Sequence, residues 1–189
     1  MSPTTQRHIK TLSRDTSALL IIDIQERILK VMQNPDEVIK STLKLIKGFK
    51  VLNLPIFYTE QYPKGLGATS SDLLEELVGL SAIQKMTFSC SGAGNFFQRL
   101  TDNKITQVVI AGIESHVCVQ QTVMDLLSNG FQVNVCADAV SSRKEIDYQT
   151  ALNRMRNYGA DITTAESVLF ELLNECGTDE FKLVSKIVK

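Results

Sequence analysis

The stretch that decides the fold is Thr106-Gln-Val-Val-Ile-Ala111, followed directly by Gly112-Ile-Glu-Ser-His-Val-Cys118 and Val119-Gln-Gln-Thr122. Its apolar first part predicts a buried strand, and its last part predicts an amphipathic helix that begins near Cys118. Backbone N–H groups at a helix start are unpaired and the helix dipole is positive there, so a thiolate is favoured over a thiol. Cys118 is therefore a candidate nucleophile, and the alternative is a small buried apolar residue, the role expected of Cys90, Cys136 and Cys176.

Apolar runs alternate with helical patterns on both sides of this stretch. Residues 18–22 form a continuous apolar run, as a strand covered on both faces requires. Asn34-Pro35 then predicts a helix start, and apolar residues follow at spacings of three and four. Further strands are expected at 54–58, 82–85, 131–135 and 161–163, with helices between them. This alternation predicts an α/β fold, a three-layer α/β/α sandwich with a mainly parallel, about six-stranded sheet, related to the Rossmann type.

The length and composition of the chain are those of one globular domain. It has 189 residues, of which 43% are hydrophobic and 22% are charged. We expect a flexible N-terminal tail over residues 1–15 and a single domain over residues 16–189. The net charge of −1 argues against nucleic-acid and membrane partners, and no apolar run approaches the roughly 20 residues needed to cross a bilayer.

The N-terminal residues and the cysteines bear on the compartment. No apolar segment of a secretory signal is present, which favours a cytoplasmic protein. Arg7, Lys10 and Arg14, with no acid before Asp15, leave a mitochondrial transit peptide as the alternative. The four cysteines form no C-x-x-C pair, so neither a zinc site nor a redox dithiol is indicated.

In an open parallel sheet the functional site lies beyond the carboxyl ends of the strands. Asp23 follows the first strand directly, where it would act as a base or merely cap a turn. Lys85 stands among residues that look buried, where it would hold a thiolate, the alternative being a solvated lysine. His116 lies too close to Cys118 in the sequence to serve as its base, and we expect it to line the pocket.

Three motifs together resemble the isochorismatase-like cysteine hydrolases, which include nicotinamidases. They are Asp23-x-Gln25, the isolated Lys85, and Gly112-Ile-Glu-Ser-x-x-Cys118-Val-x-x-Thr122, and the resemblance runs over about residues 16–173. Thr-Glu-Gln-Tyr-Pro-Lys-Gly-Leu-Gly at 59–67 and Asp-Ala-Val-Ser-Ser-Arg at 138–143 look closest to the isochorismatase domain-containing branch.

The resemblance implies a mechanism and an assembly. Asp23 would deprotonate Cys118, and Lys85 would stabilise both the carboxylate and the thiolate. The thiolate would attack a carbonyl to form a thioester, which water then hydrolyses. The backbone N–H groups of Glu114 and Cys118 would form the oxyanion hole, in a loop with a cis peptide between Ile113 and Glu114. Family members are expected to be homo-oligomers.

Departures from the family pattern narrow the chemistry. Nicotinamidases carry an Asp-x-His metal motif after the second strand, whereas this chain has Thr59-Glu-Gln-Tyr62, so no metal and no cofactor are expected. Isochorismatases proper lack the cysteine, so Cys118 argues against isochorismate as the substrate.

The pocket and the substrate follow from these motifs. The pocket candidates predict a small, fairly apolar cavity for an amide or related acyl compound; they are Ile24, Gln25, Tyr62, Phe88, His116 and Val117. The alternative is a catalytically quiet family member that serves in protein association. A Rossmann-type nucleotide binder is disfavoured, because no G-x-G-x-x-G follows the first strand.

Overall fold

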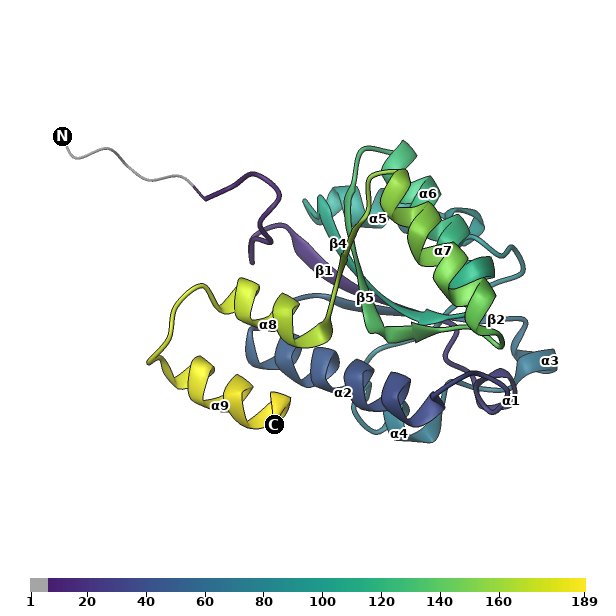
Figure 1. Cartoon of the computed structure of the whole chain (residues 1–189), viewed down its shortest axis with the longest axis horizontal. Helices are drawn as coiled ribbons and strands as arrows, with labels where there is room; N and C mark the ends of the chain where they lie inside the picture. Colours follow the sequence, from purple (N-terminus) through teal and green to yellow (C-terminus); the bar gives the residue numbers. More distant parts are fainter. Residues whose placement is uncertain (1–6) are drawn as a thin grey trace.

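Six parallel strands form the centre of the computed structural model, which describes residues 7–189 (Figure 1). The strand order is β3-β2-β1-β4-β5-β6. Their bounds are β1 (Ser17–Ile22), β2 (Ile56–Gln61), β3 (Ile83–Lys85), β4 (Gln107–Ile113), β5 (Gln132–Ser141) and β6 (Asp161–Thr163). The predicted parallel sheet and its approximate number of strands are thus confirmed.

Helices cover both faces of the sheet, which confirms the predicted three-layer sandwich (Figure 1). One layer comprises α2 (Pro35–Val51), α4 (Ser71–Leu74), α8 (Ala165–Leu173) and α9 (Asp179–Val188). The other comprises α5 (Phe96–Asp102), α6 (Gln120–Ser128) and α7 (Glu145–Asn157). Residues 7–189 also contain four short helical segments: α1 (Glu26–Leu29), α3 (Pro63–Leu66), η1 (Cys90–Gly92) and η2 (Ser115–Val119).

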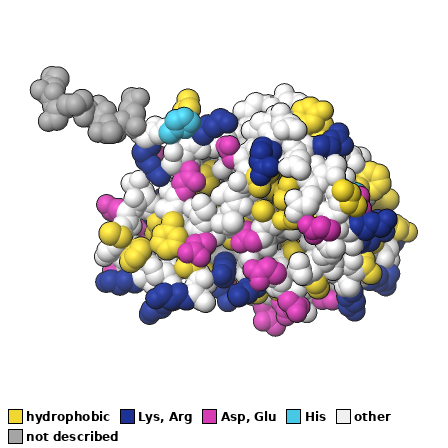
Figure 2. Space-filling view, in the orientation of Figure 1, with side chains coloured by type: hydrophobic (Ala, Val, Ile, Leu, Met, Phe, Trp, Pro, Cys, Tyr) yellow, Lys and Arg dark blue, Asp and Glu magenta, His cyan; other side chains and the backbone are white. Residues whose placement is uncertain are grey.

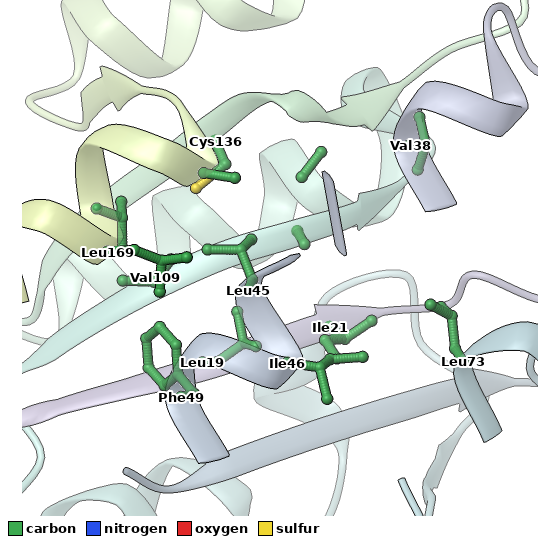
Figure 3. Packing of buried hydrophobic residues seen from close by; sticks show 14 of the residues in the cluster. Leu19, Ile21, Val38, Leu45, Ile46, Phe49, Leu73, Val109, Cys136 and Leu169 are labelled. Atoms are coloured by element: carbon green, nitrogen blue, oxygen red, sulfur yellow. The ribbon is translucent and has the colours of Figure 1, made fainter. Parts of the chain in front are cut away.

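The central strands are apolar throughout because each face of the sheet packs on a helical layer. In β1, Leu19 and Ile21 belong to the core beneath α2, whereas Leu20 and Ile22 belong to the core beneath the other layer. Figure 3 shows the first of these cores, in which Leu45, Ile46 and Phe49 of α2 meet side chains of β1 and β4. Each such side chain contributes about 1.5–3 kcal/mol by burial. These two cores fix β1 and β4, the strands that lead into the candidate site.

The chain changes direction in the sheet between β1 and β4, and the ends of these strands lie very close together. From β1 the chain adds β2 and β3 on one side, and it then crosses to β4 on the other side of β1. Gly112 near the end of β4 has φ +148°, and a Cβ there would lie 2.5 Å from the carbonyl oxygen of Ile22. Glycine is required because any larger side chain would force the two strand ends apart. In doubly wound sheets, such a switch point is where ligands bind.

The N-terminal segment differs from the expected flexible tail over residues 1–15. Residues 1–6 lie outside the described part of the chain. Leu12 is buried in the core, and its N–H donates to Glu171 Oε1 at 2.7 Å. The guanidinium of Arg14 donates to the carbonyl oxygens of Leu172 and Leu173 at the end of α8. The prediction was wrong for this part, because an apolar anchor and a cation at a helix C-terminus bind the segment to the domain.

Two features of the exterior bear on partners. Within residues 7–189, every helix is too short or too polar to cross a membrane. Figure 2 shows one face of the molecule, on which basic and acidic side chains are interspersed and hydrophobic side chains occur in small groups. This face therefore presents no extended surface of a single charge.

Candidate active site

A buried ion pair joins Asp23 to Lys85 at the carboxyl ends of β1 and β3. Asp23 follows β1 in a left-handed conformation with φ 53°, which Asp tolerates better than most residues. Lys85 ends β3, and its Nζ lies 2.6 Å from Asp23 Oδ2. The two side chains are only 0% (Lys85) and 3% (Asp23) exposed. The alternative of a solvated lysine at a strand edge is therefore excluded.

Both members of the pair have further hydrogen-bond partners. Lys85 Nζ also donates to Gln61 Oε1 at 2.9 Å and to the carbonyl oxygens of Thr87 and Phe88 at 3.1 and 2.8 Å. Thr59 Oγ1 donates to Asp23 Oδ1 at 2.7 Å. A buried charge is tolerated only when it is paired and hydrogen-bonded, and these contacts meet that condition for both residues.

Cys118 lies in the π-helical segment η2, and its side chain faces the same cluster. Its Sγ donates to Gln61 Oε1 at 3.2 Å, so one carboxamide oxygen accepts from both the thiol and the Lys85 ammonium. Burial raises the pKa of the Cys118 thiol well above its usual range, and the negative charge of Asp23 raises this pKa further, while Lys85 opposes both effects.

This raised pKa opposes the preference for a thiolate that was expected at a helix start. Cys118 is the fourth residue of η2 and is 8% exposed, so its side chain is largely desolvated, which disfavours the charged form. A base beside the thiol would offset this effect.

The loop between β4 and Cys118 is held from both sides. The peptide between Ile113 and Glu114 is cis, at the position that the family resemblance indicated. The N–H groups of Val117 and Val119, on either side of Cys118, donate to the carbonyl oxygen of Glu114 at 3.0 and 3.2 Å. The Glu114 carboxylate accepts from Arg143 Nε at 2.8 Å, which ties the loop to the end of β5.

A cavity of about 200 Å³ opens above this cluster. Of the predicted pocket residues, Tyr62, Phe88 and Val117 line it. Its other lining residues are Asp23, Ile28, Gln61, Leu66, Ile113, Glu114 and Cys118. Figure 1 places α1 and α3, which contribute Ile28 and Leu66, at the end of the sheet opposite to the N-terminal segment. The wall is mainly apolar, with the thiol and its polar neighbours on one side.

Three predicted pocket residues do not line the cavity. Ile24 is fully buried in the core beneath α2, because the left-handed turn at Asp23 directs the chain inwards. Gln25 is also fully buried; its Oε1 accepts from the Gln61 N–H at 2.8 Å and its Nε2 donates to the Gln61 carbonyl oxygen at 3.1 Å. Gln25 thus positions the backbone of Gln61 at the end of β2.

His116 also faces away from the cavity. Its Nδ1 lies 2.9 Å from Ser142 Oγ, and its Nε2 lies 3.9 Å from Asp147 on α7. In a π-helical segment, residues two apart point in different directions, so the neighbour of a nucleophile need not share its cavity. The expectation that His116 lines the pocket was wrong.

Sequence reasoning missed Gln61 and Thr59 as members of the site. Both lie on β2, in the segment Thr59-Glu-Gln-Tyr62, which the sequence supplied only as part of a family motif and as evidence against a metal motif. Alternation along a strand places residues two apart on the same face, which was the signal available. Glu60, between them, instead accepts hydrogen bonds from the N–H and Oγ1 of Thr69.

Within the described residues, no three or more His, Cys, Asp and Glu side chains are grouped so that they could hold a metal ion. The site offers acid–base and nucleophilic groups: a carboxylate, an ammonium and a thiol around one cavity. A reaction without metal or cofactor stays a prediction.

Comparison with known proteins places this arrangement in a family. The isochorismatase domain model matches residues 17–167. Isochorismatase family protein 1B of Dictyostelium discoideum is 37% identical over 187 residues, which cover 97% of this chain and 91% of that protein. Both matches include the segments that carry Asp23, Lys85 and Cys118.

Solved structures have the same fold. The structure of MAR1 ribonuclease from Caenorhabditis elegans aligns with a TM-score of 0.87 and 37% identity, covering 94% of this chain and 91% of that one. YcaC of Escherichia coli, described as an octameric hydrolase of unknown specificity, aligns with a TM-score of 0.88 and 24% identity, covering 97% and 91%. On the domain match and the identity over nearly the whole chain, this protein belongs to the isochorismatase family.

Proposed function

We propose that the chain is a metal-independent cysteine hydrolase that cleaves a small amide or a related acyl compound through a thioester on Cys118. The observation that carries this proposal is the buried Asp23–Lys85 pair, linked through Gln61 to a thiol on the wall of a cavity. A buried ion pair is costly to maintain unless its geometry is excellent, and its position beside a nucleophile supports a catalytic role.

In the first half of the reaction, Asp23 removes the thiol proton from Cys118. The sulfur electron pair forms a C–S bond with the substrate carbonyl carbon, and the carbonyl electrons move to oxygen. The C–N bond then breaks, and the leaving nitrogen takes the proton from Asp23. A base is required because the pKa of the thiol is raised by burial, so that the free thiolate is scarce near neutral pH.

In the second half, water attacks the thioester and gives one proton to Asp23. The C–S bond breaks, the carboxylic acid leaves, and Asp23 returns the proton to Cys118. The net reaction consumes one amide and one water and yields an acid and an amine. Lys85 keeps the carboxylate in place and opposes the rise in the pKa of the thiol.

The oxyanion of each tetrahedral intermediate would be held by the N–H groups of Glu114 and Cys118. Two features support this role for the loop: the carbonyl oxygen of Glu114 orders the turn around Cys118, and Arg143 fixes the Glu114 side chain. Removing one such donor typically slows a hydrolase by about 100- to 1,000-fold.

A homo-oligomer is part of the proposal, since the fold relative YcaC is described as octameric. The second candidate is a family member retained for protein association, with little turnover. Ribonuclease activity, suggested by the name of the MAR1 relative, is less well supported, because within residues 7–189 no Lys, Arg or His side chain lines the cavity to bind a phosphodiester.

A substrate screen with matched cysteine variants tests this function. Purified protein is incubated with amides, ureido compounds, esters and a short RNA, and product formation is compared between wild type, Cys118→Ala and Cys176→Ala. Cys176 is exposed, so the second variant controls for the loss of a thiol. We expect hydrolysis that Cys118→Ala abolishes and Cys176→Ala retains. Activity that survives in Cys118→Ala would refute the proposed nucleophile, and turnover of no compound in the library would favour the association protein.

A further inference from the structure

The charges around the cavity bear on which substrate it accepts. We infer that the acyl part of the substrate is uncharged and apolar and is no larger than about a six-membered ring. The cavity therefore excludes compounds that carry a carboxylate on the acyl part. This inference deepens the proposed function and rests on it.

The wall of the cavity contains acidic groups and no basic ones. Within residues 7–189, the lining includes the carboxylates of Asp23 and Glu114, and no Lys, Arg or His side chain. The remaining wall is largely apolar, formed by residues such as Ile28, Leu66 and Val117. Both carboxylates are already paired, Asp23 with Lys85 and Glu114 with Arg143. A substrate carboxylate would therefore lose its hydration in the cavity without finding a free cation in its wall.

Lys85, although close, has no N–H group to offer an anion. An ammonium has three N–H bonds. Four acceptors lie within 3.1 Å of Lys85 Nζ: Asp23 Oδ2, Gln61 Oε1 and the carbonyl oxygens of Thr87 and Phe88. A substrate anion could bind this cation only by displacing one of them. Displacing Asp23 or a carbonyl oxygen would cost a buried ion pair or hydrogen bond, and displacing Gln61 Oε1 would leave it only the hydrogen bond from Cys118.

Arg143 is a further cation near the site, and it is engaged as well. Its Nε donates to Glu114 Oε2 at 2.8 Å, and its side chain is 57% exposed. The pairing neutralises Glu114 at the edge of the cavity and directs the guanidinium toward solvent. Arg143 is thus a positioning residue for the loop and is not a receptor for a carboxylate inside the cavity.

The volume limits the size of the acyl group. A dry apolar cavity of about 150 Å³ holds benzene, whereas drug-sized ligands occupy about 300–1,000 Å³. The cavity here is about 200 Å³. Because the thioester joins the acyl group to Cys118, that group must occupy this space while the amine leaves. An aliphatic or single-ring acyl group fits.

Matched pairs of amides test the inference. Benzamide is compared with 4-carboxybenzamide, and hexanamide with adipic acid monoamide, so that each pair differs mainly in one carboxylate. Ammonia release gives kcat/KM for each compound. In parallel, each amide competes with a neutral haloacetamide for Cys118, and mass spectrometry of the Cys118 peptide reports occupancy of the cavity without requiring turnover.

We expect the neutral member of each pair to protect Cys118 at a concentration at least about 100-fold lower than the anionic member requires, because a carboxylate would be buried unpaired. Equal or better protection by the anionic member would overturn the inference, and so would the absence of protection by either. Protection by the neutral member without ammonia release would support the inferred ligand class and would count against the proposed hydrolysis.

Two variants of Leu66 separate charge from shape. Leu66→Lys places an ammonium on the cavity wall, and Leu66→Met changes the shape of the wall without adding a charge. The quantity compared is the ratio of the protecting concentration of the anionic amide to that of the neutral amide. Leu66→Lys should reduce this ratio by about 10-fold or more, as expected for a newly paired carboxylate. Leu66→Met should keep the ratio. The same ratio in both variants would mean that charge does not decide what the cavity accepts.

Discussion

Removing both members of the Asp23–Lys85 pair should cost no more stability than removing Lys85 alone. In Lys85→Met the Asp23 carboxylate stays buried, with Thr59 as its remaining hydrogen-bond donor among those described above. In Asp23→Asn the ammonium of Lys85 retains three acceptors, which are Gln61 Oε1 and the two carbonyl oxygens. The first variant should therefore lose more stability than the second.

The structure sets the size of these effects. Both side chains are almost fully buried and their charged atoms are 2.6 Å apart, so breaking the pair falls in the range of about 3–5 kcal/mol measured for buried ion pairs. We expect about 4–5 kcal/mol for Lys85→Met and about 3 kcal/mol for Asp23→Asn. The double variant should cost no more than Lys85→Met alone, because no uncompensated charge remains.

Urea unfolding of the four proteins, followed by circular dichroism, measures the coupling free energy. We expect a coupling of about 3 kcal/mol, which is at the upper end of what neighbouring residues show. Additivity within about 0.5 kcal/mol would refute it, since independent sites behave in this way. The slope of each transition serves as the control, because a changed slope would indicate altered compactness and would invalidate the comparison.

Three further predictions address the surroundings of the pair. Burial raises the pKa of Cys90 to about 11. Between pH 9 and 11 the unfolded thiol ionises and the folded one does not, so this thiol should lower the free energy of unfolding by about 2–3 kcal/mol over that range. In urea unfolding under reducing conditions, Cys90→Ala should therefore show a smaller dependence of stability on pH than the wild type. In the same assay, Gly112→Ala should lower the free energy of unfolding by about 1–3 kcal/mol more than Gly79→Ala does. Both glycines have positive φ, but only a Cβ at Gly112 would clash with Ile22. Gln61→Leu should cost about 1–3 kcal/mol by removing an acceptor from a buried ammonium, and an unchanged midpoint would count against its place in the cluster.

The sequence predicted those parts of the fold in which one physical pattern dominates. Continuous apolar runs in β1 and β4 required cover on both faces, and the helical spacing in α2 supplied one of the layers. β5 was predicted only over residues 131–135, yet it extends to Ser141. The extension includes Asp138, a polar residue that the strand tolerates because its carboxylate accepts hydrogen bonds from the Ala165 N–H and from Ser41 Oγ. No local sequence pattern reveals these contacts.

The sequence predicted the main residues of the candidate site better than it predicted their contacts. Strand ends and a motif identified Asp23, Lys85 and Cys118. The roles of Gln25 and Gln61 depend on which way each carboxamide points, and that is decided by pairing across two strands. The direction in which the pKa of the Cys118 thiol is shifted was not predictable, because it depends on burial, a property of the whole fold.

Activation of Cys118 by Asp23 can be tested by comparing the alkylation rates of the four cysteines. Cys176 is exposed and provides an internal reference, while Cys90 and Cys136 are buried and would react if the protein unfolded. Asp23→Asn removes the base, and it also removes a negative charge that raises the pKa of the Cys118 thiol. With a small neutral haloacetamide near pH 7.5, we predict that the loss of the base outweighs the lower pKa, so that the rate at Cys118 falls by about 100-fold or more, the usual contribution of a general base. The rates at the other three cysteines should stay unchanged. An unchanged rate at Cys118 in a folded Asp23→Asn protein would contradict the account.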